Sequence, residues 1–194
     1  MKKVILLIYI ICFANLFTKA QLTESFTDGD ITTSPAWGGG LTDFTVNPAF
    51  QLQSNNSIVN STYYLSTAST LATTAQWEFY HQISFNPSSA NYTDVFLTAS
   101  ASDLTATTTN GYFVRIGNTA DEIALYRKDG AVVTKIIDGV DGTLNTSNNI
   151  MKIKVVRNAA NQFTLNRDLT GTGNSYFTEG VVTDVTYTTS AFFG

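Results

Sequence analysis

The stretch that decides the fold is residues 76–85, QWEFYHQISF. Its residues alternate with a period of two, which is typical of a β-strand that buries one face. One face carries Trp77, Phe79, His81, Ile83 and Phe85. The other carries Glu78, Tyr80, Gln82 and Ser84. We therefore expect a strand with its tryptophan face in the core, in which the histidine has one ring nitrogen hydrogen-bonded.

Similar short apolar or alternating runs occur along most of the chain, whereas helical periodicity is nearly absent. They predict further strands at residues 44–46, 51–53, 63–65, 94–98, 112–116, 123–127, 132–137, 150–157 and 163–166. Thr, Ser and Asn make up 61 of the 194 residues, which favours strands joined by loops. Two stretches of low complexity, residues 66–75 and 98–111, are interpreted as connecting loops.

Two hairpins are expected. Asp129-Gly130 lies between alternating arms and can supply the positive φ that a two-residue turn requires. The segment NAANQ, residues 158–162, is expected to join a second pair of strands. Because no helices intervene, neighbouring strands must be antiparallel. The pattern predicts an all-β protein built as a two-sheet antiparallel β-sandwich of the jelly-roll kind.

The N-terminus has the features of a signal peptide. Lys2 and Lys3 precede an apolar run at residues 4–17, and Thr18-Lys19-Ala20 offers small residues for cleavage before Gln21. We therefore expect two parts, a signal peptide at residues 1–20 and one domain at residues 21–194. The alternative is a membrane anchor, but the 14 residues of this apolar run would span only about 21 Å of a hydrocarbon core about 30 Å thick. A lipoprotein acylated at Cys12 is disfavoured because Ile11 stands where a small residue is wanted.

The net charge of the chain limits the kinds of partner that it can bind. Removal of residues 1–20 leaves eight basic and 15 acidic residues, a formal net charge of −7. The basic residues are thinly spread, so nucleic acid is an unsuitable partner. We expect a secreted or cell-surface protein with no membrane span after cleavage. The only cysteine lies in the apolar run, so the mature core must be stable without disulfides.

Several segments resemble a concanavalin A-like lectin/glucanase module found in secreted surface proteins of Bacteroidetes. The matching segments are FTDGDITTSPAW, FTVNPAFQLQ, WEFYHQISFNPSSANYTDVFL, NGYFVRIG, IALYRKDG, TKIIDGVDG and SAFFG. The resemblance covers residues 24–194. It implies a concanavalin A-like jelly roll, an extracellular location, carbohydrate binding, and downstream domains such as lamin-tail-like ones as partners within a longer protein. It also implies two strands after SAFFG, so the sandwich is expected to lack its last strands.

Sugar binding requires aromatic rings for stacking and polar side chains for directed hydrogen bonds. Residues expected to line the core are Trp77, Phe79, Val95, Leu97, Tyr112, Val114, Ile116, Ile123 and Leu125. If they do, alternation places an aromatic and polar set on the opposite face. The predicted ligand-binding residues are Glu78, Tyr80, Gln82, Phe96, Phe113, Arg115 and Tyr126. Arg115 is the preferred polar residue because its guanidinium can bridge neighbouring hydroxyls or a carboxylate.

A structural calcium ion is the one cofactor considered. Asp28-Gly29-Asp30 places hard oxygen ligands on a tight turn, and a similar run begins at Asp138. Neither run has the complete EF-hand pattern, and Asp-Gly is also an ordinary turn dipeptide.

No catalytic residues are predicted. The sequence has no run of alternating acids, although two carboxylates from distant segments would suffice for glycoside hydrolysis. We expect a non-enzymatic lectin-like module that binds carbohydrate or a cell-surface polymer. The alternatives are a structural spacer or protein-interaction domain and, less favoured, a glycoside hydrolase using Glu78 or Glu122.

Overall fold

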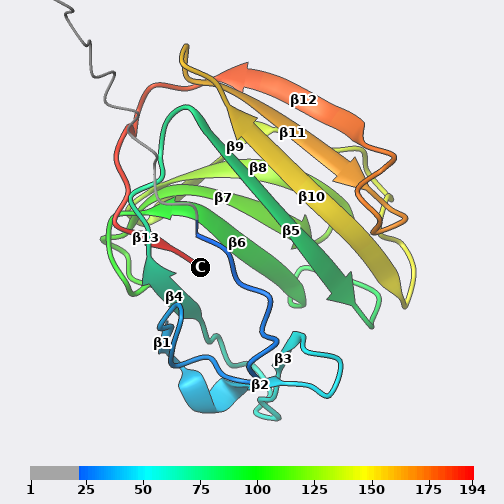
Figure 1. Cartoon of the computed structure of the whole chain (residues 1–194). Coiled ribbons are helices and arrows are strands. Elements are labelled where there is room, and N and C mark those ends of the chain that lie inside the picture. Colours follow the sequence, from blue (N-terminus) through cyan, green and yellow to red (C-terminus); the bar gives the residue numbers. More distant parts are fainter. Residues whose placement is uncertain (1–21) are drawn as a thin grey trace, which may run out of the picture.

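A computed structural model describes residues 22–194, and the predicted signal peptide lies outside these residues. Two antiparallel sheets pack face to face as a β-sandwich, with a small hairpin below them (Figure 1). The only helical segment in the described part is the short 3-10 turn η1, Leu41–Asp43. The all-β, antiparallel sandwich expected from the sequence is confirmed.

The larger sheet has seven strands in the order β1-β4-β13-β6-β7-β8-β9. Their bounds are β1 Gly38–Gly39, β4 Leu65–Ala68, β13 Phe192–Phe193, β6 Tyr92–Ala99, β7 Asn110–Gly117, β8 Glu122–Asp129 and β9 Val132–Ile137. The short β13 lies between β4 and β6 and pairs with both. The last strand of the described chain is therefore internal to this sheet.

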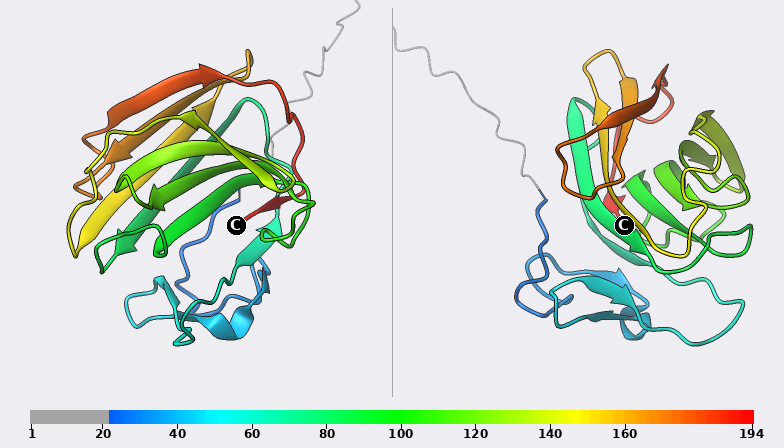
Figure 2. Two further views of the ribbon diagram at one scale, coloured as in Figure 1. Left: turned by 180° about the vertical axis from the view of Figure 1, so that it is seen from behind. Right: turned by 90° about the vertical axis from the view of Figure 1, so that its right-hand side faces the viewer.

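The second sheet has four strands in the order β12-β11-β10-β5, and the two sheets face each other in the side view of Figure 2. Its strands are β5 Ala75–Ile83, β10 Asn149–Arg157, β11 Gln162–Asp168 and β12 Phe177–Thr183. A separate hairpin pairs β2 Phe44–Val46 with β3 Leu52–Ser54.

The main core lies between the two sheets and contains the residues that alternation predicted. The nine predicted positions, fully or partly buried there, are Trp77, Phe79, Val95, Leu97, Tyr112, Val114, Ile116, Ile123 and Leu125. From the four-stranded sheet, Ile153, Val155, Phe163 and Leu165 complete the layer. Full burial of one such side chain contributes roughly 1.5–3 kcal/mol, so this layer stabilises the fold without disulfides.

Both predicted hairpins form. β8 and β9 pair with Asp129 opposite Val132, so the two loop residues are Gly130 and Ala131, one position later than expected. Gly130 has a φ of 63°, which a residue without Cβ adopts at little cost. The chain at residues 158–161 connects β10 to β11, with Arg157 opposite Phe163.

Three expectations were wrong in detail. Phe85 lies beyond the end of β5 and is exposed rather than in the core row. The supposed loop at residues 66–75 begins inside β4, where Ser66 and Thr67 are buried and donate their hydroxyls to the carbonyls of Ser102 and Ala36. Strand β12 was not anticipated, since Gly180 and the exposed positions of this edge strand interrupt its alternation. Among residues 22–194 no helix is long and apolar enough to cross a membrane.

Candidate functional site

The seven predicted ligand-binding residues do not share one surface, which corrects the expectation. Glu78, Tyr80 and Gln82 lie on β5, on the face of the four-stranded sheet that points away from the core. The other four lie on the face of the seven-stranded sheet that points away from the four-stranded sheet, here called the open face. They are Phe96, Phe113, Arg115 and Tyr126. The sequence fixes which side of a strand a residue occupies, but not which sheet the strand joins.

The three rings of the open face stack on one another across β6, β7 and β8. The ring centroids of Phe96 and Phe113 are 4.9 Å apart, and those of Phe113 and Tyr126 are 5.3 Å apart with an interplanar angle of 8°. Phe113 is 1% exposed. With Leu104, the rings form a second apolar cluster. Because the rings cover each other and Phe96 and Tyr126 are only 6% and 7% exposed, none of the three is the exposed stacking platform that was predicted.

Next to these rings, Arg115 and Asp94 form a cross-strand ion pair. They are register partners on β7 and β6, and the guanidinium donates from Nε and Nη2 to the two carboxylate oxygens at 2.7 Å each. The guanidinium carbon lies 4.2 Å from the centroid of the Tyr92 ring and 5.1 Å from that of Tyr126. Within the described chain, Nη1 of Arg115 and the hydroxyls of both tyrosines have no hydrogen-bond partner. Tyr92 is 40% exposed, the Arg115 side chain 17% and Tyr126 7%, so the group meets solvent chiefly at Tyr92.

Burial sets the electrostatics of this pair. Desolvation raises the pKa of Asp94, although the hydrogen bonds and charge of Arg115 oppose that rise. Desolvation works against the charge of Arg115, but Asp94 outweighs it and the pKa of Arg115 is raised. Burial also raises the pKa of Tyr126, because desolvation disfavours the phenolate. Arg115, Asp94, Tyr92 and Tyr126, here called the Arg115 cluster, thus present a neutralised ion pair and phenolic hydroxyls, which can hydrogen-bond without a net charge.

A second ion pair lies on the open face beyond the Arg115 cluster. Lys135 on β9 donates to Glu122 on β8 at 2.5 Å and also pairs with Asp138. Glu122 in turn accepts from the backbone N–H of Gly139 at 2.8 Å. Glu122 and Glu78, the two acids considered for hydrolysis, therefore face away from each other on different sheets. Glu78 is held by Lys152 at 2.8 Å, and its pKa is lowered chiefly by that hydrogen bond.

The remaining predicted residues make a polar row on the outer face of the four-stranded sheet. Tyr80, which is 44% exposed, donates its hydroxyl to Gln82 at 3.3 Å. Gln82 donates to the side chain of Asn148 at 3.2 Å. A shallow pocket of about 210 Å³ lies beside this row and is lined in part by Asn148 and Leu169. Tyr80 is the exposed aromatic ring of the predicted set.

Asp28 and Asp30, the proposed calcium ligands, lie in an exposed turn before β1. Asp30 accepts from the backbone N–H of Thr32 at 2.7 Å and from the hydroxyls of Thr32 and Thr33. These bonds lower the pKa of Asp30, with the backbone bond of Thr32 the largest cause. Asp28 accepts from the backbone N–H of Asp30 at 3.1 Å. Within residues 22–194, no three His, Cys, Asp or Glu side chains are grouped so that they could hold a metal ion.

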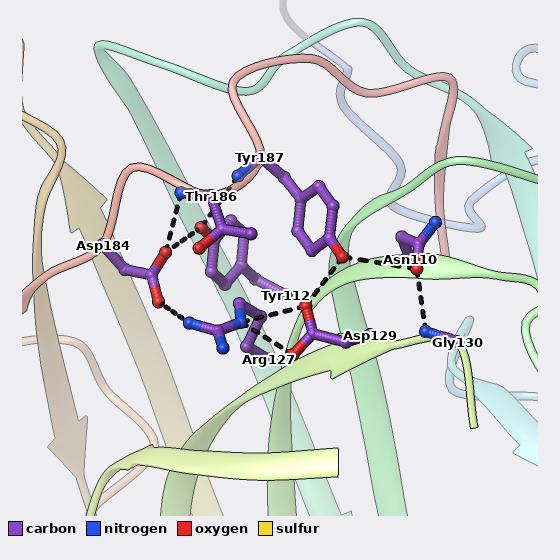
Figure 3. Close-up of polar contacts among 8 residues, drawn as sticks. All are labelled: Asn110, Tyr112, Arg127, Asp129, Gly130, Asp184, Thr186 and Tyr187. Atoms are coloured by element: carbon purple, nitrogen blue, oxygen red, sulfur yellow. Dashed lines mark hydrogen bonds and ion pairs between the residues drawn. The ribbon is translucent and has the colours of Figure 1, made fainter. Parts of the chain in front are cut away.

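A larger polar network closes one end of the sandwich (Figure 3). Asp184, just after β12, accepts from the Tyr112 hydroxyl at 2.6 Å and from Arg127 at 2.5 Å, while Arg127 also pairs with Asp129 at 2.9 Å. The Tyr187 hydroxyl donates to Asp129 at 2.7 Å. Since the members of the network satisfy one another, we interpret it as structural.

Sequence reasoning missed Tyr92 and Asp94. The signal was available, because both alternate with the predicted core residue Val95 and so fall on the face of Phe96. The expected strand began at residue 94, two residues later than β6 begins. The pairing of Asp94 with Arg115 depends on the register between β6 and β7, which alternation alone does not give.

Comparisons with models of protein families, with curated proteins and with solved structures give no match to this chain. The fold itself defines the class, a two-sheet antiparallel β-sandwich. Its function must therefore be argued from the open face and from the surfaces beside it.

Proposed function

We propose that the mature chain is a secreted, non-enzymatic lectin-like module that binds a carbohydrate or cell-surface polymer on the open face. The Arg115–Asp94 ion pair between Tyr92 and Tyr126 is the observation that carries the proposal. The resemblance to concanavalin A-like modules agrees with this function and with a location outside the cell. On this proposal the module serves a longer surface protein whose downstream domains are further partners.

The chemistry of the cluster suits sugar hydroxyls. Each hydroxyl can donate and accept, and the cluster offers a guanidinium N–H and two phenolic hydroxyls within a small area. Because Asp94 already neutralises Arg115, the ligand does not have to supply a negative charge. The Tyr92 ring is partly exposed and adds an apolar surface next to the polar groups.

The test is binding of untagged residues 21–194 to an array of neutral and acidic glycans, followed by titration calorimetry on the strongest ligand. We expect Tyr126→Phe, which removes only a hydroxyl, to weaken binding about fivefold, since a net hydrogen bond contributes about 1 kcal/mol. Tyr92→Ala should weaken it at least as much. Arg115→Ala leaves Asp94 buried without its partner, so a circular dichroism melt must first show that this variant folds.

Tyr80→Ala on the other sheet is the matched control and should bind like the wild type. Loss of binding in Tyr80→Ala with no change in Tyr126→Phe would move the site to the four-stranded sheet. An array with no bound glycan would reject the proposal and favour a spacer or protein-interaction domain.

One observation favours that second candidate. The edge strand β9 exposes Val132 and Val133, and the edge strand β12, which lies next to β9, exposes Val181. Unpaired edges with apolar side chains are surfaces on which another chain can add a strand. Sedimentation velocity at increasing protein concentration tests this candidate directly.

A further inference from the structure

Beside the start of β6 lies a groove of about 410 Å³ to which no function has been given so far. One wall is the segment between β3 and β4, and the other is the turn that precedes β6. The lining residues are Asn56, Ile58, Val59, Asn60, Ser61, Tyr63, Ala90 and Asn91. The turn is fixed by paired backbone hydrogen bonds between Ser88 and Asn91, each 3.0 Å long.

At two points the chain passes directly from the groove to residues of the open face. Asn91 in the groove is followed by Tyr92, whose ring lies against the Arg115 guanidinium. Tyr63 in the groove is followed by Tyr64, which packs against the ring cluster of the open face. In Figure 1 the segment after β3 lies close to the beginning of β6. The chain therefore runs directly from the groove lining into the Arg115–Tyr92 contact.

The lining carries no charged side chain, although the mature chain is strongly acidic. Within the described chain, the Tyr63 hydroxyl and the Asn60 side-chain amide have no hydrogen-bond partner and can serve a ligand. Ile58 and Val59 are 71% and 82% exposed, so apolar surface stands beside these polar groups. Uncharged polar groups next to small apolar surfaces match a neutral sugar, which presents hydroxyls at its edge and C–H groups on its faces.

We propose that this groove is a subsite for a neutral polysaccharide chain that extends from the Arg115 cluster. The inference rests on the proposed function of that cluster and specifies its ligand as a neutral polymer rather than a monosaccharide or a uronate. Affinity should rise with chain length, because additional units bury Ile58 and Val59 and hydrogen-bond to Tyr63.

The experiment compares neutral hexose oligomers of two to eight units with uronate oligomers of the same lengths, using titration calorimetry. The variants are the double substitution Ile58→Ala with Val59→Ala, and Tyr63→Phe. In the wild type we expect the affinity for the best neutral series to rise at least tenfold from the shortest to the longest oligomer. In the groove variants the rise should fall below threefold, while affinity for the shortest oligomer stays unchanged.

Tyr126→Phe separates failure of the groove subsite from failure of the Arg115 site. This variant should weaken the binding of short and long oligomers by the same factor. A full length dependence in both groove variants would overturn the subsite while leaving the Arg115 site intact. Tighter binding of uronates than of neutral oligomers would overturn the assignment of a neutral ligand. No binding by any oligomer would overturn both proposals.

Discussion

The hydroxyl of Tyr112 donates a 2.6 Å hydrogen bond to Asp184, and this bond joins the two sheets. Tyr112 lies on β7 of the seven-stranded sheet, whereas Asp184 directly follows β12 of the four-stranded sheet. The backbone N–H of Thr186 also donates to Asp184, and the backbone N–H of Tyr187 donates to the Tyr112 hydroxyl. The chain that leaves β12 is thereby fixed across the end of the sandwich.

Asp184 should make folding stability depend on pH below about 4. Burial raises its pKa, but hydrogen bonds from Tyr112, Thr186 and Arg127 outweigh burial and lower the pKa to about 2 from its ordinary 3.8. A lowered folded-state pKa means that the stabilisation is complete above pH 3.8 and is lost as pH falls toward 2. We expect Asp184→Asn to lower the free energy of unfolding by about 2 kcal/mol at pH 7. The difference from wild type should shrink toward pH 2.

Urea unfolding monitored by tryptophan fluorescence between pH 2 and pH 7 measures this difference. Asp141→Asn is the control, since Asp141 is exposed and should change stability by less than about 0.5 kcal/mol. A wild-type advantage that stays constant over the whole range would show that the Asp184 carboxylate is not the titrating group.

Arg157 should be the most sensitive charged residue of the fold. It is 0% exposed, donates to the carbonyls of Ala72, Asp184 and Tyr187, and lies against the ring of Phe163. Replacement leaves buried carbonyls without donors, so Arg157→Met should cost about 3 kcal/mol in urea unfolding. Arg157→Lys should recover less than half of this loss, because one ammonium cannot reproduce the planar guanidinium. Equal stability of Arg157→Met and the outer-face control Val156→Thr would refute the argument.

The sandwich was predictable because the core residues alternate, and alternation follows from the geometry of a single strand. The distribution of strands between sheets was not, because it depends on contacts between distant segments. Trp77 and Leu125 were both expected in the core and lie there, yet their strands belong to different sheets. The predicted ligand face failed for this reason, since Tyr80 and Tyr126 point out of the sandwich on opposite sides.

The open face was only partly predictable. Arg115 and Tyr126 were identified by alternation, but the importance of Asp94 follows from a cross-strand register that only the fold provides. A register shift between Phe96 and Thr98 also turns Thr98 toward Tyr112, so simple alternation fails at Thr98, after Leu97 has entered the core as expected.

His81 should titrate far below an ordinary histidine. It lies in the core-facing row as expected, but its Nε2 is buried and no hydrogen bond to its side chain is found within residues 22–194, contrary to the expectation. Burial disfavours the charged ring and lowers its pKa from 6.5 to about 4. Stability from the neutral ring is therefore complete above pH 6.5 and is lost as pH falls toward 4.

Because the sequence contains one histidine, proton NMR of the untagged protein gives a single imidazole signal to follow. We expect a midpoint near pH 4 in the folded protein and near 6.5 in urea. A folded-state midpoint above 6 would mean that the ring is hydrated.

Calcium at Asp28 and Asp30 remains a proposal that a thermal melt can test. Calcium requires six to eight oxygen ligands, so the two carboxylates would need backbone carbonyls and water as well. If the ion binds there, millimolar calcium should raise the melting temperature of residues 21–194, and both EDTA and Asp30→Asn should remove the increase. Identical melts in calcium and EDTA would reject the site.

Phe96 should contribute to stability and not to ligand binding. Its ring stacks against Phe113, and its backbone N–H and carbonyl both pair with Gly194 on the other side of β6. Phe96→Leu keeps an apolar side chain but loses the ring contact, so we expect a loss of about 1 kcal/mol in urea unfolding. Glycan affinity should stay within twofold of wild type. Normal stability combined with at least a tenfold loss of affinity would instead show that the ring contacts the ligand. The prediction from the sequence that Phe96 stacks on the ligand would then be correct.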